Sequence, residues 1–306
     1  MKSKIFKIIA LALCVVSICM CFTGCGGGEE DTGPVVELTP EEIALRDGTL
    51  VKPSQNDEYK YNIYTTYVEL TKYLGDGGEI VIPETIEDKP VYSIAGGCYG
   101  GNNGITSVEM KDNIWRIGAG AFDGCVNLVN VKLSNNLKEL PKKSFANCYR
   151  LTFPEIPASI DYIREDTFRN CGSFDKILIP GTVQIIEKDA FYGCTGISEI
   201  IIKHGDVVDA EGYLVEENKM IVYFNAFSKI TNCKKIVVPD SVIDVTARSF
   251  SDAPADCVFY GYVPSKICNM AAESRLTFIE IVEGDEIDVL IRVRPTKVKE
   301  ETTEAK

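Results

Sequence analysis

The sequence predicts an α/β solenoid in which turns of 23 residues stack on one another and share a parallel β-sheet. Two observations predict this fold: residue types recur at a fixed spacing of 23, and a proline closes the apolar strands. The chain has 306 residues, 45% of them hydrophobic, which is enough apolar material for a sizeable core. A turn of this length cannot bury its own apolar side chains, so neighbouring turns must stack.

Two columns of identical residues carry the repeat. Phenylalanine and cysteine each return every 23 residues, and aliphatic residues keep the same phase. We expect the rings to point inward and the thiols to act as small apolar groups that donate weakly to backbone carbonyls. The columns are Phe122, Phe145, Phe168 and Phe191, and Cys125, Cys148, Cys171 and Cys194.

Disulfides and zinc are the alternatives to this reduced thiol ladder. Cysteines in register on neighbouring turns point the same way, whereas a disulfide needs a torsion of about 90°. A zinc site is disfavoured because the chain has no CxxC pair and only one histidine. Among the cysteines outside the column, the pairing of Cys257 with Cys268 stays open.

Each turn is expected to contain one short strand, such as residues 174–179, which ends at Pro180. Proline cannot donate a hydrogen bond to a central ladder, so it marks the end of the strand. Strands from successive turns should pair in parallel about 4.8 Å apart. Pro154 instead occupies an inward position within a strand, and we expect it to weaken that rung.

Residues 117–125 read Ile-Gly-Ala-Gly-Ala-Phe-Asp-Gly-Cys, and this motif resembles the BspA-like leucine-rich repeat of bacterial surface proteins. The resemblance implies a leucine-rich-repeat domain over residues 59–282, with a cap at each end. Its C-terminal cap would contain a helix around residues 267–273. The family resemblance also implies a role in adhesion.

One turn departs from the repeat. Pro180 and Pro239 are 59 residues apart, so the turn between Lys203 and Cys233 is rewritten. Residues 209–212 separate two alternating segments and predict a hairpin turn. This hairpin-bearing insertion also occurs in the resembled family, which favours a structural variant over a grafted active site. The acidic residues around it lack the spacing of an EF-hand, so a solvated hairpin is favoured over a calcium site.

The N-terminus reads as a targeting segment. Three lysines precede the apolar residues 8–20, which are too few for a membrane span, so residues 1–24 predict a secretory signal. The signal ends in Cys-Phe-Thr-Gly-Cys, which resembles the lipobox of bacterial lipoproteins and implies lipid attachment at Cys25. An ordinary cleaved signal is the alternative. Residues 25–58 are then expected to form a tether with a short helix starting near Thr39.

Composition excludes some functions. Lys and Arg number 32 against 45 Asp and Glu, a formal charge of -13, which argues against a nucleic-acid groove. Nucleophile motifs, phosphate loops and metal signatures are missing from the sequence, so neither an enzyme nor a cofactor is expected. The single histidine, His204, directly follows a strand, and a surface turn is favoured over a catalytic role.

The candidate binding surface is an outward stripe of Leu178, Ile201 and Val237, with Phe153 and Lys176 beside it. Exposed apolar patches often mark interfaces, so the stripe predicts a docking site. Alternatively, the hairpin or a strand-like segment at residues 287–293 covers it. Residues 283–306 are interpreted as that segment followed by a disordered charged tail.

The resulting hypothesis is a protein outside the cytoplasm, held at a bacterial membrane or cell surface by the Cys25 lipid. Its repeat surface would bind an unknown extracellular protein or glycan. A surface polysaccharide or wall hydrolase, or its accessory, is one alternative and would require two carboxylates in a cleft. A structural spacer is the other, and it is favoured if the sheet face is featureless.

Overall fold

The computed structural model describes residues 39–208, 214–246, 248–250, 252–273 and 276–292, in two compact units, Met1–Asp47 and Gly48–Lys306. The described part of the first unit contains helix α2 (Pro40–Asp47). Its capping box confirms the predicted helix start: Thr39 N donates to Glu42 Oε2 at 2.8 Å, and Glu42 N donates to Thr39 Oγ1 at 3.2 Å. Cys25 and the signal segment lie outside the described residues.

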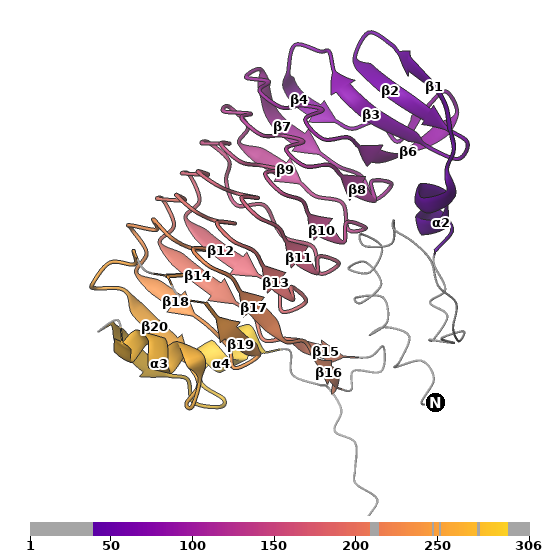
Figure 1. Cartoon of the computed structure of the whole chain (residues 1–306). Helices are drawn as coiled ribbons and strands as arrows, with labels where there is room; N and C mark the ends of the chain where they lie inside the picture. The colour runs from indigo at the N-terminus through magenta and orange to yellow at the C-terminus, as the bar shows by residue number, and fades with distance from the viewer. Residues whose placement is uncertain (1–38, 209–213, 247, 251, 274–275, 293–306) are drawn as a thin grey trace, which may run out of the picture. The chain divides into compact units, whose positions relative to one another are not determined.

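The second unit is a solenoid of parallel strands, as expected, and Figure 1 shows strands of successive turns side by side. Leu178 pairs with Ile201 and Ile179 with Ile202, so the register advances by one 23-residue turn. Regular turns also contribute a second strand of two residues that the sequence did not predict, and these strands form a second parallel ladder with two slightly longer strands of later turns. The second ladder consists of β10 (Glu139–Leu140), β11 (Tyr162–Ile163), β13 (Ile185–Ile186), β17 (Met220–Val222) and β19 (Val242–Val245).

The first ladder, which contains the predicted strands, is split into two sheets. Its N-terminal sheet consists of β4 (Gly78–Val81), β7 (Ile105–Glu109) and β9 (Asn130–Lys132). Its C-terminal sheet consists of β12 (Lys176–Ile179), β14 (Glu199–Ile202), β18 (Lys235–Val237), β20 (Val258–Gly261) and β21 (Thr277–Glu280).

The N-terminal end of the solenoid begins earlier than predicted. Strand β1 (Leu50–Gln55) pairs antiparallel with β2 (Tyr59–Tyr64), which pairs antiparallel with β3 (Val68–Tyr73). Strand β1 therefore extends the sheet to Leu50, N-terminal to the predicted domain start at residue 59. The same sheet continues through β6 (Lys89–Ile94) to β5 (Thr85–Ile86) and β8 (Arg116–Ile117).

The core contains both predicted columns. Neighbouring phenylalanine rings stack with centroids 5.2 Å apart for Phe122 and Phe145, and 5.7 Å apart for Phe145 and Phe168. Each column thiol donates to the backbone oxygen of an aromatic residue in the preceding turn: Cys148 Sγ lies 3.2 Å from Phe122 O. Burial raises the pKa of Cys125 to about 11, so the thiols stay protonated. Equivalent bonds join Cys125 to Tyr99, Cys171 to Phe145 and Cys194 to Phe168.

Helix is scarce, so the fold is a β-solenoid and the α/β class is not confirmed. Within the described part of the second unit, helices are α3 (Lys266–Glu273) and α4 (Glu286–Ile291). The strand-like prediction for residues 287–293 is wrong. Asp285 caps a helix there by accepting from Asp288 N at 2.7 Å. In the rewritten turn, β15 (Asp206–Val208) pairs antiparallel with β16 (Leu214–Glu217), and the expected turn residues 209–212 lie outside the described residues.

Candidate docking groove

The split in the first ladder occurs at the rung that contains Pro154. Residues 151–157 form no strand, so β9 and β12 are not paired through them. Proline has no backbone N–H to donate, which explains the missing rung. The predicted weakening at Pro154 is confirmed.

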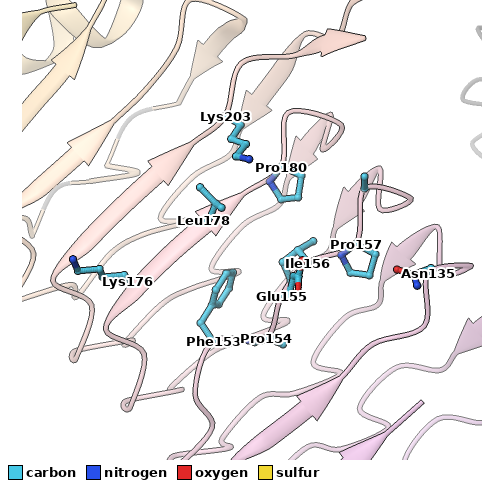
Figure 2. A pocket seen from close by; sticks show the side chains of 11 residues that line it. Asn135, Phe153, Pro154, Glu155, Ile156, Pro157, Lys176, Leu178, Pro180 and Lys203 are labelled. Carbon is cyan, nitrogen blue, oxygen red and sulfur yellow. The ribbon is translucent and has the colours of Figure 1, made fainter. Parts of the chain in front are cut away.

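A groove of about 510 Å³ opens beside this missing rung (Figure 2). Its apolar lining comes from the broken rung and from the exposed face of β12. Leu178 on β12 is 42% exposed. The lining residues are Asn135, Phe153, Pro154, Glu155, Ile156, Pro157, Ala158, Lys176, Leu178, Pro180 and Lys203.

Phe153 forms part of the floor and does not stand on the outer face as predicted. Its ring packs against core rings, with centroids 5.2 Å from Phe174 and 5.9 Å from Phe168. The irregular backbone at Pro154 releases Phe153 from the strand alternation, so the ring turns inward and remains half-buried.

Two lysines line the groove in a protein of negative net charge. Lys176 Nζ lies 3.3 Å from Glu199 Oε2, and Lys235 Nζ lies 2.9 Å from Glu199 Oε1. Burial alone would raise the pKa of Glu199, but the hydrogen bonds from both lysines outweigh it and lower that pKa. Lys176 is thus partly neutralised, and Lys203 is the second cation at the groove.

The predicted stripe is only partly at the surface. Leu178, Ile201 and Val237 lie in register across β12, β14 and β18. Leu178 is exposed and Ile201 is half-buried, but Val237 is fully buried against Ile291 of α4. Val237 is therefore not part of an open surface, because the C-terminal segment covers it, as one of the alternatives anticipated.

The surface-turn prediction for His204 is wrong. The residue is only 2% exposed. Its Nδ1 lies 2.8 Å from Asp206 Oδ1, and its Nε2 lies 2.8 Å from Asp240 Oδ1. Its backbone N–H donates to Ile291 O at 2.8 Å. Asp240 and Ile291 come from distant parts of the chain, so no local sequence signal could reveal these two contacts.

The remaining cysteines are also placed differently from the pair left open. Cys257 lies beside Cys233 of the preceding turn, and the interaction between the two thiols raises the pKa of Cys233. Both residues are fully buried, whereas Cys268 on α3 is partly exposed. In the part of the chain that the structure describes, no group of three side chains is arranged to hold a metal ion.

Comparison with known protein families identifies the type of repeat. A model of the BspA type leucine rich repeat region matches residues 92–211 in six copies. Residues 92–211 are BspA-type leucine-rich repeats. The groove lies within this matched region, on turns of the repeat that the family model describes.

Two solved structures of leucine-rich repeat proteins share the fold. A T. pallidum leucine-rich repeat protein is 21% identical, covers 75% of this chain and 98% of its own, and gives a TM-score of 0.51. A leucine-rich repeat protein from Bacteroides ovatus is 20% identical, covers 69% of this chain and 56% of its own, and gives a TM-score of 0.50. At these identities the likeness establishes the fold alone. No curated protein matches the chain. Among described residues, helices long and apolar enough to span a bilayer are absent.

Proposed function

We propose that this BspA-type repeat protein is a lipid-anchored recognition protein of the bacterial cell surface that binds another protein through the groove at Pro154, in adhesion. The broken rung is the observation that carries this proposal. It interrupts an otherwise regular ladder and opens an apolar floor next to exposed Leu178. Exposed apolar residues in a concave site are typical of ligand binding.

The lining of the groove defines the chemistry of the partner. Phe153 and Leu178 offer apolar contact, and Lys176 and Lys203 offer positive charge on an acidic protein. A protein segment with a large apolar side chain next to an aspartate or glutamate complements this arrangement. The proposal is non-enzymatic. Glu155 is the only carboxylate in the lining, whereas glycoside hydrolysis ordinarily uses two.

The groove is tested with short synthetic peptides that place a leucine or phenylalanine next to an acidic residue. Leu178→Asp should weaken their binding about tenfold or more, because it places a charge in the apolar contact. Ile243→Asp is a matched control, since Ile243 is 44% exposed on β19 and lies outside the groove. Equal binding by wild type and Leu178→Asp would contradict the proposal, as would binding of a glycan array without binding of any peptide.

The anchor is tested separately, in whole cells of a lipoprotein-processing bacterium. Cys25→Ala should move the protein from the membrane fraction to the medium or soluble fraction, because lipid attachment needs the Cys25 thiol. Cys268→Ala serves as the control, since it also removes one cysteine but leaves the lipobox-like motif intact. Unchanged partitioning of Cys25→Ala into detergent would contradict the anchor.

A further inference from the structure

An apolar row crosses the whole C-terminal sheet of the first ladder. The row begins at Leu178 in the groove and takes one residue from each of the five strands. Strand register places its members side by side, so they share one face of the sheet. The row consists of Leu178, Ile201, Val237, Tyr260 and Ile279.

Helix α4 covers the middle of this apolar row. Ile287 and Ile291, four residues apart on the helix, pack in one cluster with Val237. Such spacing places both side chains on the same helix face. The two ends of the row stay open: Leu178 is 42% exposed and Ile279 is 44% exposed. The chain itself thus demonstrates that the row accepts an amphipathic helix.

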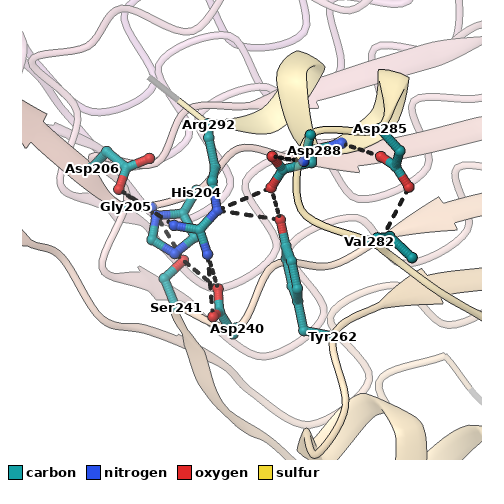
Figure 3. A network of polar contacts seen from close by, with 11 residues as sticks. His204, Gly205, Asp206, Asp240, Ser241, Tyr262, Val282, Asp285, Asp288 and Arg292 are labelled. Carbon is teal, nitrogen blue, oxygen red and sulfur yellow. Dashed lines mark hydrogen bonds and ion pairs between the residues drawn. The ribbon is translucent and has the colours of Figure 1, made fainter. Parts of the chain in front are cut away.

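A cluster of charged residues holds the end of α4 (Figure 3). Arg292, directly after the helix, places Nη2 3.1 Å from Asp240 Oδ1 and Nε 3.1 Å from Asp288 Oδ1. Tyr262 also donates to Asp288 Oδ1. Asp240 in turn pairs with buried His204, whose other ring nitrogen faces Asp206. Arg292 therefore connects α4 to the His204 pair, in addition to the hydrogen bond from His204 N to Ile291 O.

The cover is small compared with the surface it protects. Helix α4 has six residues, and a helix this short has little stability of its own in water. Its outer residues Val289 and Leu290 are 54% and 46% exposed, so nothing in the described chain packs over them. Docking of α4 thus depends on two isoleucines and on a few polar contacts, made by Arg292, by Asp288 with Tyr262, and by Ile291 O with the backbone N–H of His204.

We infer that the apolar row is a helix-docking surface, and that α4 is a cis cover which an amphipathic helix of the partner protein displaces. The displacing helix would present two aliphatic residues four apart, followed by an arginine, as α4 does. Displacement would join Val237 and Ile201 to exposed Leu178 and lengthen the docking groove. This inference deepens the proposed function, since it names the partner's second contact on the same sheet face.

The test uses a labelled synthetic peptide with the sequence of residues 282–292 and the full-length protein. In the variant Ile287→Asp/Ile291→Asp, the chain's own helix cannot cover the row, and the peptide should bind. Intact protein should bind the peptide about tenfold more weakly or less, because apparent affinity falls with the fraction of chains whose row is open. A peptide carrying the same two substitutions is the matched control and should not bind.

Two further measurements make the result decisive. Adding Val237→Asp to the released variant should abolish peptide binding, because it places a carboxylate in the row. A chain that ends at Val282 provides a second released form, and thermal unfolding followed by circular dichroism verifies that each variant is folded. Failure of both folded released forms to bind the peptide would overturn the inference, as would equal binding by intact protein. Neither result bears on the groove, because Leu178→Asp tests the groove while α4 remains in place.

Discussion

The regular turns and the C-terminal end of the solenoid are held together in different ways. In residues 114–202 the same contacts recur in every turn, such as a ring on a ring and a thiol on a carbonyl. In residues 203–292 the ring stack continues through Phe227 and Phe250. The contacts added there occur once: His204 with its two aspartates, Arg292 with α4, and Cys233 with Cys257. Repetition distributes stability over neighbouring turns. Single contacts concentrate it in a few side chains, which makes that end the easier one to release.

The largest effect is expected in the regular turns. Phe168→Ala should lower the free energy of unfolding by about 3–5 kcal/mol, because it leaves a cavity in the ring stack. Rings of Phe145 and Phe191 lie 5.7 and 5.3 Å from Phe168, so both neighbouring turns lose contact. Urea denaturation measures the change. Tyr149→Ala, at a residue that is 52% exposed, is the control and should change stability by less than about 0.5 kcal/mol. Similar values for both variants would contradict the shared core.

A smaller, pH-dependent effect is expected at His204. Burial alone would lower its pKa, but the hydrogen bond to Asp240 and the charge of Asp206 outweigh burial and Arg292, so the pKa is raised. The folded state therefore holds the proton more tightly than the unfolded state. The stability that this proton contributes is fully present below the ordinary value of 6.5 and is lost as the pH rises through the folded pKa.

Denaturation of wild type and His204→Gln across this pH range measures the contribution. The difference in free energy of unfolding between the two proteins should shrink as the pH rises. Binding of the peptide with the sequence of residues 282–292 to intact protein should increase over the same range. A stability difference that stays constant or grows with pH would show that the proton on His204 does not hold the C-terminal end.

The smallest effect is expected in the thiol ladder. Cys148→Ala removes the donor to Phe122 O, which should cost about 0.5–1.5 kcal/mol by urea denaturation. Cys148→Ser keeps a donor at this position and is the matched control. Protein denatured without reductant should also titrate with at least the four thiols of the column, and a smaller number would disprove the reduced ladder.

The regular turns were predictable because their contacts have a period. The 23-residue spacing predicted the inward rings, the thiol column and the strand register. The missing backbone N–H of Pro154 predicted the weakened rung. The second parallel ladder was missed because its two-residue strands are too short to show alternation.

The candidate surface was predictable only in part. Leu178 and Lys176 line the groove as the stripe suggested, but Phe153 turns inward once the strand is broken. Burial of Val237 and His204 depends on residues 287–292, which are far from both residues in the sequence. Such contacts have no period. The run of apolar residues in α4 predicts a strand unless Asp285 is recognised as the N-cap of a helix.

The equal length of the turns also determines the position of the groove along the solenoid. Each turn contacts its two neighbours, so gain or loss of one 23-residue block between β1 and β9 would leave the groove's own lining intact. Every such block would shift the groove along the stack by about 4.8 Å, the spacing of adjacent strands. Variation in copy number would therefore change the distance between the proposed binding site and the N-terminal end of the solenoid in fixed increments, while the chemistry of the site stays constant.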